Sequence, residues 1–163
     1  MKKFLLVALM AIASVAFVNA QPRAVGVNLG YGAGFSYQHG FGGTNMLDLA
    51  VDIPFFNGIG GVITYDWIDP FNAPVPWNER GEWHWYMGVG GTGGMYGFYG
   101  DDGIGWYAGV AGHIGIEYDF WFPLQLSFDW RPNIGVTNWK DDKVGFNIRG
   151  LYSGISLGVR YKF

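Results

Sequence analysis

Residues 106–120 read WYAGVAGHIGIEYDF, and large apolar side chains alternate there with small, polar and charged ones. One series is Trp106, Ala108, Val110, Ile114, Ile116, Tyr118 and Phe120, and the other is Tyr107, Gly109, Ala111, His113, Gly115, Glu117 and Asp119. Successive side chains of a β-strand point to opposite faces, so a period of two predicts a strand with one apolar and one mostly polar face.

The same alternation recurs along most of the chain. It is found at 25–38, 47–55, 61–67, 83–90, 124–131 and 151–163. Turn-rich pieces separate these runs at 39–45, 56–58, 68–82, 100–103, 121–124 and 137–143. No capping motif opens a run with the helical period, so the sequence predicts an all-β protein.

Composition excludes several classes of protein. The chain has 163 residues, of which 28 are glycine, and 19% are aromatic. This aromatic content argues against a disordered chain, and the glycines lack the three-residue period of collagen. The absence of cysteine excludes a disulfide scaffold and a thiolate metal site, and a net charge of −3 argues against nucleic-acid binding.

The first twenty residues, MKKFLLVALMAIASVAFVNA, have the pattern of an export signal. Lys2 and Lys3 precede an apolar run from 4 to 18, and Ala20 supplies a small residue before a cleavage site. The apolar run is too short for a membrane-spanning helix. We therefore predict a signal peptide at 1–20, a single domain at 21–163, and export into the envelope of a Gram-negative bacterium.

The distribution of residue types between the two faces favours a membrane barrel over a soluble one. A soluble barrel would carry many Lys and Glu on its polar face, yet Lys140, Lys143 and Lys162 are the only lysines after residue 20. Aromatic residues gather at strand ends, as in the interfacial girdles of transmembrane barrels. The sequence predicts a closed antiparallel up-and-down transmembrane β-barrel in the outer membrane.

The segments GVNLGYG, GFSYQHGFGGTNMLDLAVDI, ITYDW, WYMGVGG, GIEYDF, LQLSFDW and LGVRYKF together resemble the small opacity-type, OmpA-transmembrane-like barrel family. The resemblance is one of pattern and covers nearly all of 21–163. It implies that Tyr161 and the terminal Phe163 form the insertion signal read by the barrel-assembly machinery. The chain ends at the barrel, so the peptidoglycan-binding role of OmpA itself is not expected.

The number of strands follows from topology. Both ends of such a barrel lie on the periplasmic side, which requires an even number of strands, but only seven segments are clear. Either the run at 83–99 breaks at 91–94, or the first run breaks near Gly32, as the family pattern favours. Both alternatives give eight strands.

Eight strands enclose a lumen that side chains fill, so we expect a packed polar core and no diffusion pore. Because unpaired charges are costly there, the inward-facing charged residues should form a structural network of ion pairs. This network is predicted to comprise Asp48, Asp52, Asp66, Glu117, Asp119, Asp129, Arg131, Arg160 and Lys162.

No catalytic, cofactor or metal site emerges. His39, His84 and His113 lie on separate segments without a paired histidine, which favours structural roles. Ser36 and His39 are three apart on a strand and so should face opposite ways. The GVGGTG motif at 88–93 is followed by more strand, and therefore does not indicate a dinucleotide site.

The sequence thus predicts a non-enzymatic, monomeric outer-membrane barrel with a structural or surface-interaction role. Outer-membrane lipid is its expected surrounding, and extracellular loops are its expected contacts with proteins or glycans. Two alternatives remain, a narrow channel or carrier for small hydrophobic molecules and a secreted soluble lipocalin-like barrel.

Overall fold

The computed structural model describes residues 21–42, 44–70, 80–99, 103–139 and 143–163, and the predicted signal peptide lies outside these residues. Within them the chain forms ten β-strands and one short 3-10 turn, η1, at Pro54–Phe56. The strands are β1 Gln21–Gly30, β2 Ala33–Gly40, β3 Asn45–Ile53, β4 Gly58–Pro70, β5 Gly81–Tyr96, β6 Gly105–Phe120, β7 Leu124–Trp130, β8 Asn133–Trp139, β9 Lys143–Arg149 and β10 Ile155–Lys162. None of the helical turns in the described ranges has the length and apolar character to cross a membrane.

Eight of the strands close into an antiparallel barrel, as predicted. β1 to β7 pair in sequence order, and β10 joins β7 to β1 to complete the ring. At the closing seam Val27 lies opposite Val159 on one side and opposite Phe35 on the other. Closure satisfies the backbone groups that an open sheet would leave at its edges.

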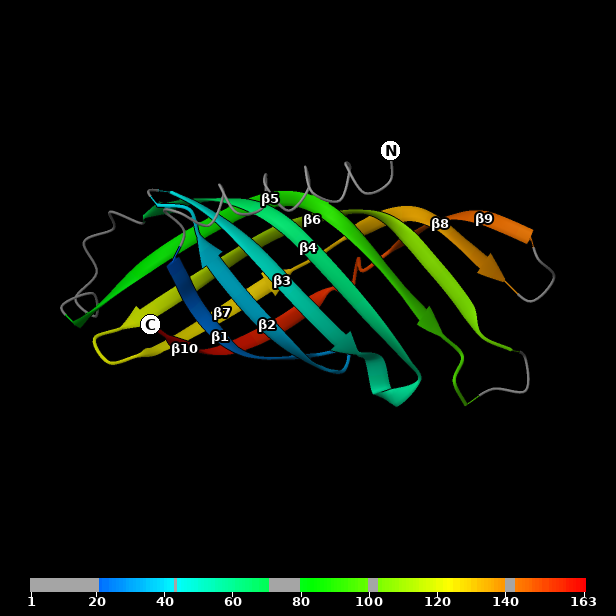
Figure 1. Cartoon of the computed structure of the whole chain (residues 1–163), viewed down its shortest axis with the longest axis horizontal. Helices are drawn as coiled ribbons and strands as arrows, with labels where there is room; N and C mark the ends of the chain where they lie inside the picture. Colours follow the sequence, from blue (N-terminus) through cyan, green and yellow to red (C-terminus); the bar gives the residue numbers. More distant parts are fainter. Residues whose placement is uncertain (1–20, 43, 71–79, 100–102, 140–142) are drawn as a thin grey trace, which may run out of the picture.

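The remaining strands, β8 and β9, extend one hairpin of the barrel. β8 follows β7 after a break at Arg131 and Pro132, and β9 leads into β10 through the turn at 150–154. Proline cannot donate a ladder hydrogen bond, and Gly150 has a φ of 77°, so both residues suit these interruptions. Figure 1 shows β8 and β9 projecting beyond the short β1–β2 hairpin, where β8 pairs with β6.

The eighth strand comes from a break near Gly32, the alternative that the family pattern favoured. β1 and β2 are separate strands joined at 31–32, whereas β5 continues through 91–94. We call the end of the barrel where β1 begins and β10 finishes the near end, and the opposite end the far end (Figure 1). β4 ends and β5 begins at the near end.

Several sequence boundaries were wrong, and two of them lie at the divided hairpin. Residues 151–154, predicted to begin the last strand, form a turn in which Tyr152 is 91% exposed. Residues 137–139, predicted to be turn-rich, belong to β8. In both cases the break in the hairpin at Pro132 and Gly150 shifts the strand away from the position that alternation alone indicates.

The barrel is apolar outside and polar inside, with the phase that the alternation predicted. Among the described residues the buried apolar side chains are few: Ala24, Met46, Ala50, Ile68, Tyr86 and Ala111. The buried polar ones are more numerous and include Asp48, Asp66, His113, Glu117, Asp129 and Arg160. Large apolar side chains such as Val27, Phe35 and Leu157 are exposed on the outer face.

Candidate functional site

The lumen holds one layer of charge towards the near end, a second layer of charge in the middle of the barrel, and a cavity towards the far end. Arg160 is the centre of the middle layer. Its Nε donates to Ser36 Oγ at 2.7 Å, its Nη1 to Ser127 Oγ at 2.6 Å, and its Nη2 to Asn28 Oδ1 at 3.2 Å. Asp129 Oδ2 lies 3.3 Å from Nη2. Arg160 thus links its own strand to β1, β2 and β7.

Arg131 forms the second cationic centre of this layer. Its Nη2 lies 3.0 Å from Asp48 Oδ1 and 4.0 Å from Asp129 Oδ1. Asp48 Oδ2 is also 3.9 Å from Arg160 Nη2. The two arginines therefore share the same carboxylates, which gives a connected network in place of isolated pairs.

His113 joins two of these carboxylates. Its Nδ1 lies 3.0 Å from Asp66 Oδ2 and its Nε2 lies 3.1 Å from Asp129 Oδ1. Carboxylates only accept hydrogen bonds, so the two contacts together call for a proton on each ring nitrogen. Asp129 also accepts a hydrogen bond from the buried hydroxyl of Tyr86.

A second layer lies towards the near end. Arg23 pairs with Glu117, and its Nη2 lies 3.9 Å from Asp119 Oδ2. Lys162 Nζ is 3.2 Å from the same Asp119 oxygen. His84 Nε2 lies 3.9 Å from that oxygen and 3.6 Å from Glu82 Oε2. Two cationic side chains thus face two buried carboxylates, so this layer is close to neutral.

The structure brings together all but one of the charged residues predicted for the lumen. The exception is Asp52, which makes no hydrogen bond or ion pair with any residue in the described part of the chain. Tyr161 and Phe163, the predicted insertion signal, are exposed on the outer face at the near end, with ring centroids 5.5 Å apart.

Sequence reasoning missed Arg23, Tyr86 and the contacts of His113. Arg23 belongs by alternation to the outer face, but an irregularity in the β1–β2 register between Pro22 and Ala24 turns it inward. His113 and Tyr86 stood on the polar face of their segments, and that signal was available. The alternation did not show that side chains of β6, β4 and β7 would meet one another across the lumen.

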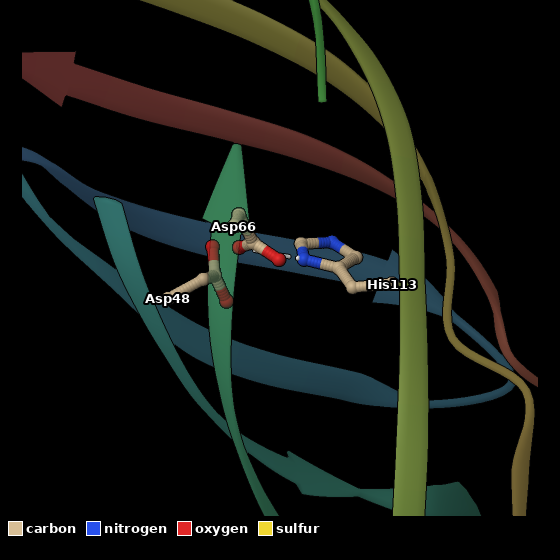
Figure 2. Close-up of side chains that lie close together, drawn as sticks. All are labelled: Asp48, Asp66 and His113. Atoms are coloured by element: carbon tan, nitrogen blue, oxygen red, sulfur yellow. Dashed lines mark hydrogen bonds and ion pairs between the residues drawn. The ribbon is translucent and has the colours of Figure 1, made fainter. Parts of the chain in front are cut away.

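The only three-residue group of potential metal ligands in the described residues is Asp48, Asp66 and His113. One ligand atom from each lies within 4.8 Å of the others, and Figure 2 shows Asp66 between the other two side chains. Two carboxylates and an imidazole are a donor set for a divalent transition metal. Here, however, Arg131 contacts Asp48, and His113 is already hydrogen-bonded at both nitrogens. An added dication would face the arginines, so the group fits an ion-pair network better than a metal centre.

The contacts of His39 are consistent with the structural role predicted for it. His39 contacts Tyr37, with 2.8 Å between His39 Nδ1 and the Tyr37 hydroxyl. Ser36 and Ser127 both accept from Arg160, and Ser127 donates to Asp129 at 2.7 Å. Neither serine hydrogen-bonds to a histidine of the described residues, so the geometry supplies no serine–histidine nucleophile among them.

Towards the far end the lumen is hollow, which refines the expectation of a filled core. Some inward positions on the far side of the middle layer are small, and among them Gly60 and Ala111 line this hollow. They leave a cavity of about 430 Å³ with Arg131 and Asn28 among its lining residues. The glycine-rich composition therefore creates space inside this half of the barrel.

Comparison of the chain with protein-family models, curated proteins and solved structures finds no match.

Proposed function

We propose that this chain is an integral outer-membrane β-barrel that is exported through its N-terminal segment and has a structural or surface-interaction role without catalysis. The observation that carries the proposal is the distribution of side chains in the closed barrel. Charged and polar groups are buried in the lumen, while large apolar side chains cover the outer face. Exposure of so large an apolar face to water is unfavourable, whereas contact with lipid acyl chains suits it.

Strand length and aromatic placement support the same proposal. β1 and β3 have 10 and 9 residues, the length that crosses a bilayer when tilted, while β4, β5 and β6 are longer, with 13 to 16, and β2, β7 and β10 are shorter, with 7 or 8. At the near end Phe120, Trp121 and Phe122 form an aromatic cluster with ring centroids 4.8 to 6.1 Å apart. Aromatic side chains of this kind settle at the boundary between acyl chains and headgroups.

The lumen is less suited to the two alternatives. A lipocalin-like soluble barrel or a carrier for hydrophobic molecules needs an apolar interior, and here layers of ion pairs fill the lumen except for a far-end cavity whose lining mixes charged, polar and apolar side chains. The charged layers also fill the lumen between the cavity and the near end, which disfavours a continuous path for solutes.

Fractionation of the cell envelope tests the proposal. We expect the protein in the outer-membrane fraction, extracted by mild detergent, with a gel mobility that changes when the sample is boiled. Recovery from the periplasm or medium with no heat-dependent shift would overturn the membrane assignment.

A matched pair of substitutions makes the test sharper. Val27 is 39% exposed at the middle of β1, and Tyr152 is 91% exposed in the turn at 150–154. A lysine facing lipid costs about 2–4 kcal/mol near the bilayer centre, so V27K should destabilise the membrane form and lower its recovery, whereas Y152K should behave like the parent. If the barrel faces water, V27K will be tolerated as well as Y152K.

A further inference from the structure

The cavity at the far end is lined by two charged side chains, Arg149 and Asp52, that form no ion pair with any other described residue. Arg149 donates to Thr137 Oγ1 at 2.9 Å, and its guanidinium carbon lies 4.6 and 4.8 Å from the ring centroids of Tyr96 and Tyr107. No carboxylate of the described residues pairs with it, whereas Arg131 and Arg160 both contact Asp129. Arg149 is therefore a half-buried cation held by aromatic rings and left open to an anion.

Asp52 is the opposite charge in the same cavity. It lies at the far end of β3, across from Gly34 of β2. A Cβ at Gly34 would stand 2.2 Å from Asp52 Oδ1, so the absence of a side chain there gives the carboxylate its room. With no hydrogen bond or ion pair to the described residues, this carboxylate is available to a donor in the cavity.

Tyr107 extends from one charge towards the other. Its ring lies beside Arg149, and its hydroxyl reaches β4, where a Cβ at Gly60 would be 2.3 Å away. Gly60 is the ladder partner of Asp52. The cavity therefore presents a cation on one wall, a carboxylate on the other, and an aromatic surface between them.

We propose that this cavity binds a small zwitterion of the α-amino-acid type, with its carboxylate on Arg149 and its ammonium on Asp52. A volume of about 430 Å³ suits a ligand of this size. Two partly desolvated charges of opposite sign are costly when each is alone, and a ligand that carries both complementary charges relieves both costs at once. The inference does not depend on whether the outer face of the barrel meets lipid or water.

Calorimetric titration of the purified full chain with three probes tests the proposal. L-phenylalanine carries both charges, 3-phenylpropionate lacks the ammonium, and 2-phenylethylamine lacks the carboxylate. A charge-assisted hydrogen bond is worth about 1.5–3 kcal/mol, so each truncated probe should bind roughly ten- to a hundredfold more weakly than phenylalanine. Failure of phenylalanine to saturate the protein at millimolar concentration, or equal affinity for all three probes, overturns the proposal without any variant.

Substitutions then assign each charge. R149Q should remove the preference for phenylalanine over 2-phenylethylamine, and D52N should remove its preference over 3-phenylpropionate. R80Q is the matched control, because Arg80 lies beside Trp121 at the near end, with its guanidinium carbon 5.9 Å from that ring. It should leave all three affinities unchanged. Preferences that survive R149Q and D52N, in variants that keep the circular-dichroism spectrum of the parent, would place the ligand elsewhere.

Discussion

Replacement of Arg160 by methionine tests whether the ion-pair network stabilises the barrel. Arg160 is 1% exposed, and its side chain donates to Ser36, Ser127 and Asp129. Its removal therefore leaves these groups on β2 and β7 without their cationic partner. Methionine fills much of the same volume with an apolar chain, which keeps the effect electrostatic and not one of lost packing.

The magnitude follows from what remains after the substitution. Removal of one partner of a buried ion pair costs about 3–5 kcal/mol, because the other charge stays buried without compensation. Arg131 Nη2 still lies 4.0 Å from Asp129 Oδ1, and His113 Nε2 still contacts the same oxygen. These contacts hold the loss near the lower end of that range, about 3 kcal/mol.

Urea unfolding followed by tryptophan fluorescence, in the detergent or buffer that keeps the protein monodisperse, measures the change. With a slope of about 2 kcal/mol per molar urea, R160M should lower the midpoint by about 1.5 M without changing the slope. K162M is the matched control. Lys162 is 28% exposed at its side chain and pairs with Asp119, so its loss should cost less than about 1 kcal/mol.

An R160M midpoint equal to that of K162M would refute the reasoning, because a buried network and a partly exposed pair would then contribute alike. The double variant R160M/D129N gives a second check. Since the two residues contact each other, the summed losses of unfolding free energy of the two single variants should exceed the loss in the double variant. Additive costs would show that the pair does not interact.

Three further substitutions test local features of the lumen by the same unfolding measurement. Y86F removes the hydroxyl that donates to Asp129 and should cost about 1–3 kcal/mol, whereas an unchanged midpoint would mean that this hydrogen bond contributes nothing. G115A places a Cβ 2.3 Å from Tyr86 Cζ and should cost about 1–3 kcal/mol by displacing that ring, while G112A, whose Cβ would meet nothing closer than 3.6 Å, should be near neutral. G150A forces alanine to a φ of 77° and brings its Cβ within 2.6 Å of Arg131 O, so it should cost about 1–2 kcal/mol, and parental stability would show that the turn adapts.

The closed all-β fold and the phase of its two faces could be predicted because alternation is a local property of the chain. From Trp106 to Phe120, a single phase assigns every inward residue of β6 correctly, including His113 and Glu117. The break near Gly32 was one of two open alternatives, since a two-residue connection between glycine-rich strands leaves little trace in the alternation.

The rest depended on interactions that the sequence does not carry locally. A register irregularity moved Arg23 to the inner face, and Pro132 and Gly150 divided one hairpin into four strands. That Asp52 forms no ion pair with the described residues depends on where the other inward side chains lie, which only the closed barrel reveals. Membrane insertion remains a prediction that the envelope experiment addresses, and the family resemblance also stays a prediction.

The place of Arg160 at the closing seam has a kinetic consequence. Its partners lie on β1, β2 and β7, and β1 meets β10 only when the two ends of the barrel come together. Contacts between segments this distant in the chain are expected to form late, after hairpins such as β5–β6. Loss of Arg160 should therefore accelerate opening of the barrel much more than it slows assembly. The buried charges would then govern how long a finished barrel lasts, and the hairpins how fast it is made.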